Sequence, residues 1–168
     1  MSDFVIDSDC QKFQYVRKVA VSESAKFGLF TVICQYPLIE SNKSHQQSVK
    51  IIEQYAKNLG YADVALVSLF ARKELSGDRP STSFEPVGPE NDLWIERVCR
   101  ESDIIIAAWG DFPEVGKRSR DVLNLINDLD VFAIQLNRNA TPTHPLGWKK
   151  KAPKVYRRAV SSALPSAG

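Results

Sequence analysis

Short apolar runs alternate with polar turns along the chain, and this pattern predicts alternating strands and helices. The segments Phe27 to Cys34, Asp63 to Phe70 and Ile104 to Ala108 are almost entirely apolar, as strands covered on both faces require. Residues 13–20 mix apolar and polar types and indicate a strand near a sheet edge, and Val131 to Leu136 supplies a last strand. The pattern therefore predicts an α/β fold: a single three-layer domain whose mostly parallel sheet of four or five strands carries helices on both faces.

The first two helices are predicted from their end signals. Ser44 and Gln47 have the form of a capping box, and Gly60 supplies a left-handed stop. Gly88-Pro89-Glu90 is typical of a second helix start, with glycine as the N-cap and proline at the first helical position, and this helix ends near Ser102.

A third helix is predicted to begin near Pro113 and Glu114. Its first turns carry Lys117, Arg118 and Arg120, where the helix dipole disfavours cations by about 0.5 kcal/mol. A solvated basic face would tolerate that cost, whereas an anion site would combine the helix amides with these side chains. Both interpretations stay open. The apolar stripe of this helix consists of Val115, Val122, Leu123, Ile126 and Leu129.

Length, charge and cysteine content limit the class of protein. The 168 residues suit one domain large enough to bury a core. A net charge of +2 is too small to argue for a nucleic-acid partner by itself, and three scattered cysteines suggest neither a disulfide framework nor a zinc site. Because no signal peptide and no apolar run able to cross a bilayer is visible, we expect a cytoplasmic protein without a membrane partner.

The composition changes at residue 149. We place an α/β domain at residues 1–148 and a basic, flexible C-terminal tail at residues 149–168. The tail opens with Lys149, Lys150 and Lys151, and its cations alternate with aromatic residues, as in nucleic-acid contacts. A charge run of this kind is usually a solvated tail without a partner.

The strand that ends on Ala108 indicates where a ligand would bind. In open α/β sheets, ligands lie at the carboxyl ends of the strands. This end carries Trp109 and Gly110, and the turn from Gly88 to Asp92 leads into the neighbouring helix. The long polar segment 71–87 is typical of a lid or a mobile loop.

Three residues near this place have polar side chains suited to chemistry. Asp92 could orient a water molecule or act as a base, and His144, which lies between two prolines, could do acid-base work. Asn91 could bind a sugar hydroxyl beside Asp92. Each also has a simpler role, because Asn91 and Asp92 could only cap a helix, and His144 could be a loop histidine with one backbone hydrogen bond.

Four further residues are candidate ligand contacts. Trp109 could stack on a ring while Gly110 lets the ligand approach the backbone, although a tryptophan at a strand end is equally suited to core packing. Ser68 could donate a hydrogen bond, but it lacks the Gly-x-Ser-x-Gly elbow of a nucleophile. Gly88 belongs to the turn that would line the same pocket. Since no Walker loop, dinucleotide glycine pattern or two-histidine metal motif is present, the sequence predicts no cofactor and no metal.

Several segments in a fixed order resemble one family. They are Gly60-Tyr61, Val-Ser-Leu-Phe-Ala at 67–71, Pro-Val-Gly-Pro-Glu-Asn-Asp at 86–92, Ala-Ala-Trp-Gly at 107–110 and Thr-His-Pro-Leu at 143–146. With this order, the chain from about Thr31 to Leu146 resembles the uncharacterised bacterial family known as domain of unknown function 1643. The resemblance implies a compact α/β domain without an established activity.

The chain departs from the usual pattern of that family at two polar positions. The Asn-Pro-Ser-Thr-like turn after the central strand is replaced by Tyr36-Pro37-Leu38-Ile39, and the asparagine before Leu-Phe-Ala is replaced by Ser68. Both positions belong to the presumed site, so the relatives' activity need not be retained.

Two functions therefore stay open, and the oligomeric state is not indicated. The first is binding or processing of a nucleotide or nucleic-acid-related ligand at the strand ends. The short parallel sheet and the late His-Pro pair resemble the uracil-DNA glycosylase type of fold, in which Asp92 or His144 would act on a leaving base, Trp109 would stack a flipped base and the tail would hold phosphates. The second is a non-enzymatic interaction or small-ligand module that has lost the site, in which Tyr36 and Leu38 would fill that region.

Overall fold

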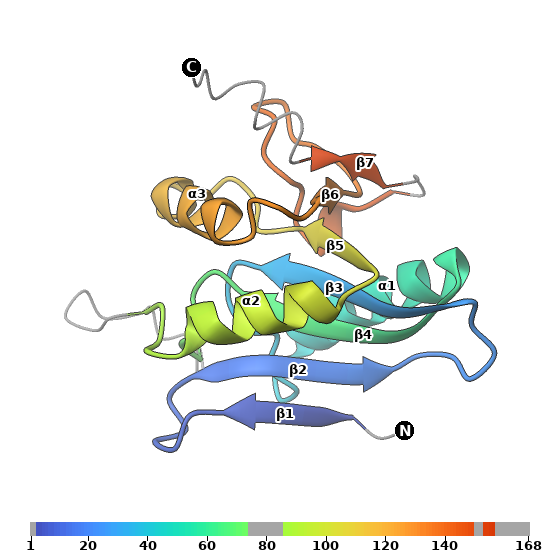
Figure 1. Ribbon diagram of the computed structural model, residues 1–168, viewed down its shortest axis with the longest axis horizontal. Helices are drawn as coiled ribbons and strands as arrows, with labels where there is room; N and C mark the ends of the chain where they lie inside the picture. Colours follow the sequence, from blue (N-terminus) through green and yellow to red (C-terminus); the bar gives the residue numbers. More distant parts are fainter. Residues whose placement is uncertain (1–2, 74–85, 150–152, 157–168) are drawn as a thin grey trace.

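The computed structural model describes residues 3–73, 86–149 and 153–156 and has a mixed α/β fold (Figure 1). Three α-helices, one 3-10 helix and seven strands are present in these ranges. In chain order the elements are β1 (Phe4–Asp7), β2 (Gln14–Ala20), β3 (Phe27–Cys34), α1 (Lys43–Leu59), β4 (Tyr61–Ser68), α2 (Asn91–Glu101), β5 (Ile104–Ala107), α3 (Val115–Leu125), β6 (Phe132–Ala133), η1 (Pro145–Gly147) and β7 (Lys154–Val155).

All seven strands form one sheet in the order β1-β2-β4-β3-β5-β6-β7. The central strands β4, β3, β5 and β6 run parallel, whereas β2 pairs antiparallel with β4, and β1 and β7 are antiparallel edge strands. The prediction of four or five strands was wrong because β1 and β7 were missed. Strand β1 is half exposed and too short to show a clear alternation, and β7 lies in the segment assigned to the tail.

Successive residues of the central strands point to opposite faces, and each face has its own core. Ile33, Val67 and Ile105 pack on the face that α2 and α3 cover. Val32 and Leu66 pack on the other face, against α1. Figure 1 shows α2 in front of the sheet and α1 behind it. The nearly continuous apolar runs of β3, β4 and β5 follow from this two-sided covering.

Two helix starts differ from the sequence prediction. The N-cap of α1 is Asn42, whose Oδ1 accepts from the amide of His45 at 3.1 Å, and Ser44 already lies inside the helix. Helix α2 has Glu90 as its N-cap, so Gly88 and Pro89 precede it. Asparagine and serine both cap well, and sequence spacing alone could not choose between Asn42 and Ser44. The predicted end of α1 was correct, because Gly60 adopts a left-handed φ of 93°.

Part of the predicted tail is ordered against the domain. Strand β7 pairs with β6, and the ring of Tyr156 meets that of Trp109 edge to face at 5.8 Å. Lys150 and Lys151, most of the tail and most of the predicted 71–87 loop lie outside the described residues, so the domain boundary stays a prediction. Within the described ranges, no helix is both long and apolar enough to span a bilayer.

Candidate functional site

The strand order creates a topological switch point at one end of the sheet. Strand β3 lies between β4 and β5, and the chain continues from β3 into α1 on one face but from β5 into α3 on the other. Such a switch point at the carboxyl ends of parallel strands is the usual ligand position in open α/β sheets. In Figure 1 the arrowhead of β3 marks this end.

Asn91 closes the carboxyl end of β4. It is fully buried, and its Nδ2 donates to the carbonyl oxygens of Ser68 at 2.8 Å and Leu69 at 3.2 Å. Its Oδ1 is also buried and has no hydrogen-bond partner among the described residues. Asn91 is therefore more than a helix cap, because it ties α2 to the sheet. Ser68 is buried and contributes its backbone carbonyl to this tie.

Arg118 joins the same cluster from α3. Its Nε donates to the carbonyl oxygen of Leu69 at 2.7 Å, and its Nη2 donates to Asp92 Oδ1 at 2.7 Å. The Arg118 side chain is only 9% exposed, whereas that of Asp92 is 57% exposed. Arg118 is therefore not part of a solvated basic face. The interpretation of all three α3 cations as such a face is wrong for this residue.

The neighbouring cations behave differently. Lys117 is 84% exposed and pairs with Asp121 one turn along α3, and Arg120 is exposed. Helical spacing could have distinguished Arg118 from Lys117 and Arg120. Arg118 lies three residues after Val115 and four before Val122, so it belongs to the buried stripe of α3.

The segments that follow β3 and β5 are joined by side chains that were not predicted to belong to the site. Gln35, directly after β3, donates from Nε2 to Glu114 Oε1 at 3.1 Å at the start of α3. Phe112 is 50% exposed, and a Cβ added at Gly110 would lie 3.5 Å from its ring. Gly110 itself has a φ of 79° and donates its amide to the Pro142 carbonyl. Gln35 could have been selected because it directly follows a buried strand, whereas Phe112 and Glu114 lie five and seven residues beyond β5.

Two candidate ligand contacts are structural residues. Trp109 is 1% exposed and packs in the core beside Tyr156, so it presents no face to a ligand. Gly88 is buried with a φ of 93°, and a Cβ there would lie 3.1 to 3.2 Å from Phe13, Ala71 and Tyr15. It is a turn and packing glycine.

His144 lies on the α1 face, away from the α2 and α3 cluster. Its Nδ1 accepts from the Leu146 amide at 3.1 Å, and η1, which it caps, contacts α1. His45 similarly accepts at Nδ1 from the Ile39 amide at 2.9 Å. Burial lowers the pKa of both imidazoles, with further lowering from His45 at His144 and from Arg17 at His45. No described contact joins His144 to Asp92.

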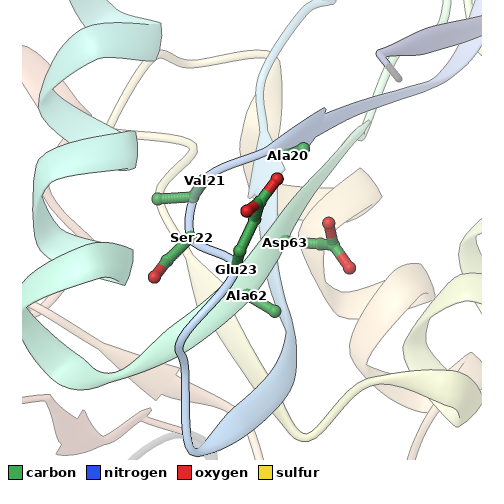
Figure 2. A pocket seen from close by; sticks show the side chains of 6 residues that line it. All are labelled: Ala20, Val21, Ser22, Glu23, Ala62 and Asp63. Atoms are coloured by element: carbon green, nitrogen blue, oxygen red, sulfur yellow. The ribbon is translucent and has the colours of Figure 1, made fainter. Parts of the chain in front are cut away.

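A separate hollow lies at the opposite end of the sheet (Figure 2). It has a volume of about 470 Å³ and is lined by residues 20–23 and 62–63, which include the carboxylates of Glu23 and Asp63. This is the amino end of β4. Among the described residues, no three His, Cys, Asp or Glu side chains gather where they could hold a metal ion.

Comparison with known proteins matches the chain to one protein family. A family model described as "Protein of unknown function (DUF1643)" matches residues 15–146. Comparison with curated proteins and with solved structures gave no match. The matched range includes the strands, helices and loops that form the carboxyl end of the sheet. The chain therefore belongs to the DUF1643 family of proteins of unknown function.

Proposed function

We propose that the protein binds a nucleotide or nucleic-acid-related ligand through its phosphate at the carboxyl ends of β3, β4 and β5. The observation that carries this proposal is the buried guanidinium of Arg118 at the end of β4. A buried cation is costly unless it is paired. Here its partners are one backbone carbonyl and one carboxylate.

Arg118 can exchange its carboxylate partner Asp92 for a phosphate group. Its two described bonds use Nε and Nη2, and neither uses Nη1. Asp92 is more than half exposed, so its carboxylate can turn into water when a phosphate replaces it. Arginine binds phosphate in a planar, two-bond geometry that lysine does not reproduce. Held by Leu69, the guanidinium needs little reordering when the ligand arrives.

The proposal is tested by calorimetric titration with inorganic phosphate, ribose 5-phosphate and mononucleotides. We expect Arg118→Lys to weaken binding of every phosphate compound at least about tenfold, because a bidentate contact is lost. Lys117→Ala is the matched control, since it removes one cation from the same helix at an exposed position, and it should leave binding unchanged.

A second variant keeps the test informative if Arg118→Lys unfolds. Asp92→Asn removes the competing carboxylate while preserving its size, so phosphate binding should be retained or become tighter. The proposal is overturned if no phosphate compound binds the wild type, or if Asp92→Asn abolishes binding in a folded protein. The catalytic roles predicted for Asp92 and His144 stay predictions.

One observation favours the second function, a module that has lost the site. The ring of Tyr36 packs against that of Phe70 at 5.3 Å beside the strand ends, in the turn where the expected family pattern has Asn-Pro-Ser-Thr. Leu38, by contrast, is buried in the core on the α1 face. A wild-type protein that binds none of the nucleotides, bases and sugar phosphates, and a Tyr36→Ser variant that is equally inert, would favour this module.

A further inference from the structure

We propose that a hollow on the α1 face of β1 and β2 binds a free aliphatic α-amino acid such as leucine. The hollow has a volume of about 400 Å³, within the range of about 300–1,000 Å³ that is usual for small-molecule sites. It lies between these two strands, at the lower edge of the sheet in Figure 1, and residues 39–41 of the loop that joins β3 to α1. The inference goes beyond the proposed function, because Arg118 lies in α3 on the opposite face.

A bulge in β2 brings two polar side chains of the hollow to the same face of the sheet. The register between β1 and β2 shifts at this point, and Tyr15 and Val16, although adjacent, both pack into the core on the α2 face. Gln14 and Arg17 therefore share the α1 face and line the hollow together. Bulges re-aim side chains in this way and are common beside active sites.

Gln14 carries a buried side-chain amide that no described residue pairs. The residue is 7% exposed, and its only described hydrogen bond is that of its backbone amide to the Ala71 carbonyl. Burial of an amide costs free energy unless the group is hydrogen-bonded. Because Gln14 lines the hollow, a ligand there can supply the partner, and its Nε2 can donate to a carboxylate.

Arg17 and Glu40 supply the two charges that a zwitterion requires. Arg17 Nη1 donates to the Leu38 carbonyl at 3.0 Å, and no ion pair of Arg17 occurs within the described part of the chain. The exposed Glu40 lines the same hollow from the loop. Asp7, the third charged residue there, already pairs with Lys73 at 3.0 Å. One cation and one anion thus remain, for a carboxylate on Arg17 and an ammonium on Glu40.

The apolar side chains of the hollow define the rest of the ligand. A smaller hollow of about 230 Å³ adjoins the first along α1 and shares only Arg17 and Glu40 with it. The two charged residues therefore lie where the hollows meet, whereas Val5 and Ile39 line the larger hollow alone. Val5 is 46% exposed, so an aliphatic side chain that rests on it removes apolar surface from water. Leucine, valine and isoleucine combine such a side chain with both charges.

Calorimetric titration with leucine and three analogues tests this inference. Isocaproate lacks the amine, isopentylamine lacks the carboxylate and glycine lacks the side chain. The wild type should bind leucine at least about tenfold more tightly than isopentylamine or glycine, because these leave the guanidinium or the apolar wall without its contact. The preference over isocaproate should be about threefold, since the contact to Glu40 is exposed.

Two substitutions distinguish the two charges of the ligand. Arg17→Gln should weaken leucine and isocaproate at least about tenfold, because both carry the carboxylate. Glu40→Gln should weaken leucine about threefold and leave isocaproate unchanged. The matched controls are Lys18→Gln, whose ammonium lies over the Phe4 ring outside the hollow, and Glu23→Gln, an exposed carboxylate in the turn after β2.

Gln14→Met keeps the inference testable if Arg17→Gln does not fold. It should weaken leucine and isocaproate several-fold without lowering the free energy of unfolding in urea, because the amide loses no partner. The inference is overturned if leucine does not bind the wild type, or if glycine or isocaproate binds as tightly as leucine. It is also overturned if folded Arg17→Gln or Gln14→Met protein binds leucine like the wild type. The proposed phosphate site at Arg118 is tested with other ligands and stands or falls separately.

Discussion

The two ends of the parallel strands differ in how their polar groups are used. At the carboxyl end, Asn91 and Arg118 are buried and bond to the carbonyls of Ser68 and Leu69. At the amino end, the carboxylate of Asp103 accepts from the amides of Gly28 and Leu29 at 2.9 and 2.8 Å. The backbone explains the contrast, because parallel strands expose carbonyls at one end and amides at the other.

The size of a hollow does not by itself identify a binding site. The hollow in Figure 2 is lined at the amino end by Glu23 and Asp63, and its lining contains no cation. The carboxyl end instead carries the buried guanidinium of Arg118 and the starts of two helices, both of which attract negative charge. Substitutions at the two ends of the strands can break this contrast.

Trp109→Ala should destabilise the protein most. The side chain is fully buried between the core and Tyr156, so its loss should lower the free energy of unfolding by about 3–5 kcal/mol, measured by urea denaturation. Trp94→Ala is the control, because Trp94 is only partly buried beside Arg97, and its effect should be clearly smaller. A stable Trp109→Ala protein that has lost ligand binding would contradict the assignment of Trp109 to the core.

Arg118→Met tests whether the carboxyl end is held together by its polar groups. Methionine preserves much of the volume but leaves the buried Leu69 carbonyl with one donor fewer, and we expect a loss of about 2–3 kcal/mol. At the amino end, the Asp103 hydrogen bonds are exposed, so Asp103→Ala should cost only about 1 kcal/mol. Equal losses in denaturation experiments would remove the energetic contrast between the two ends.

The sequence was most informative where one physical rule acted alone. The apolar runs of β3, β4 and β5 and the left-handed stop at Gly60 follow from burial and backbone geometry, and both were predicted correctly. Asn91 and Asp92 were selected as candidate site residues because they begin a helix at a strand end. The predictions failed where tertiary contacts decide, as at the short edge strand β1 and at the choice of Asn42 as a cap.

The candidate site shows the same limit. The residue types around Trp109 did not reveal that Tyr156, from the presumed tail, would cover it. The three cations of α3 appeared equivalent until the burial of Arg118 distinguished it from Lys117. Gln35 and Glu114 are far apart in sequence and meet only because β3 and β5 are neighbours. Periodicity could place each residue on an element, but it could not choose the partners of a side chain.

Gly88→Ala should have an intermediate effect at the carboxyl end. Its φ of 93° disfavours any side chain, and a Cβ would press on Phe13, Tyr15 and Ala71, so we expect a loss of about 1–3 kcal/mol. Gly116 gives a matched control, since it lies within α3 and a Cβ there would meet only Arg120 at 3.9 Å. Gly116→Ala should stabilise the protein by up to about 1 kcal/mol. A neutral Gly88→Ala variant would show that this turn can rearrange and would reopen its predicted role as a ligand contact.

The smallest effect we expect is a pH dependence that arises on the α1 side of the carboxyl end. His45 and His144 have lowered pKa values, mainly because both are partly buried, and their Nδ1 atoms accept amide hydrogen bonds that a proton would displace. The neutral forms are thus favoured by folding. Their contribution is fully present above the unfolded pKa of about 6.5 and is lost as the pH falls below it.

Urea denaturation between pH 7.5 and 5.5 measures this loss while most carboxylates remain ionised. A His45→Gln, His144→Gln double variant should show a flatter dependence, because it lacks both imidazoles and the sequence contains no other histidine. Arg17, which lowers the pKa of His45 in the wild type, is unchanged in the variant, so the comparison isolates the two imidazoles. Parallel pH profiles would mean that the two imidazoles keep the same pKa in the folded and unfolded chain.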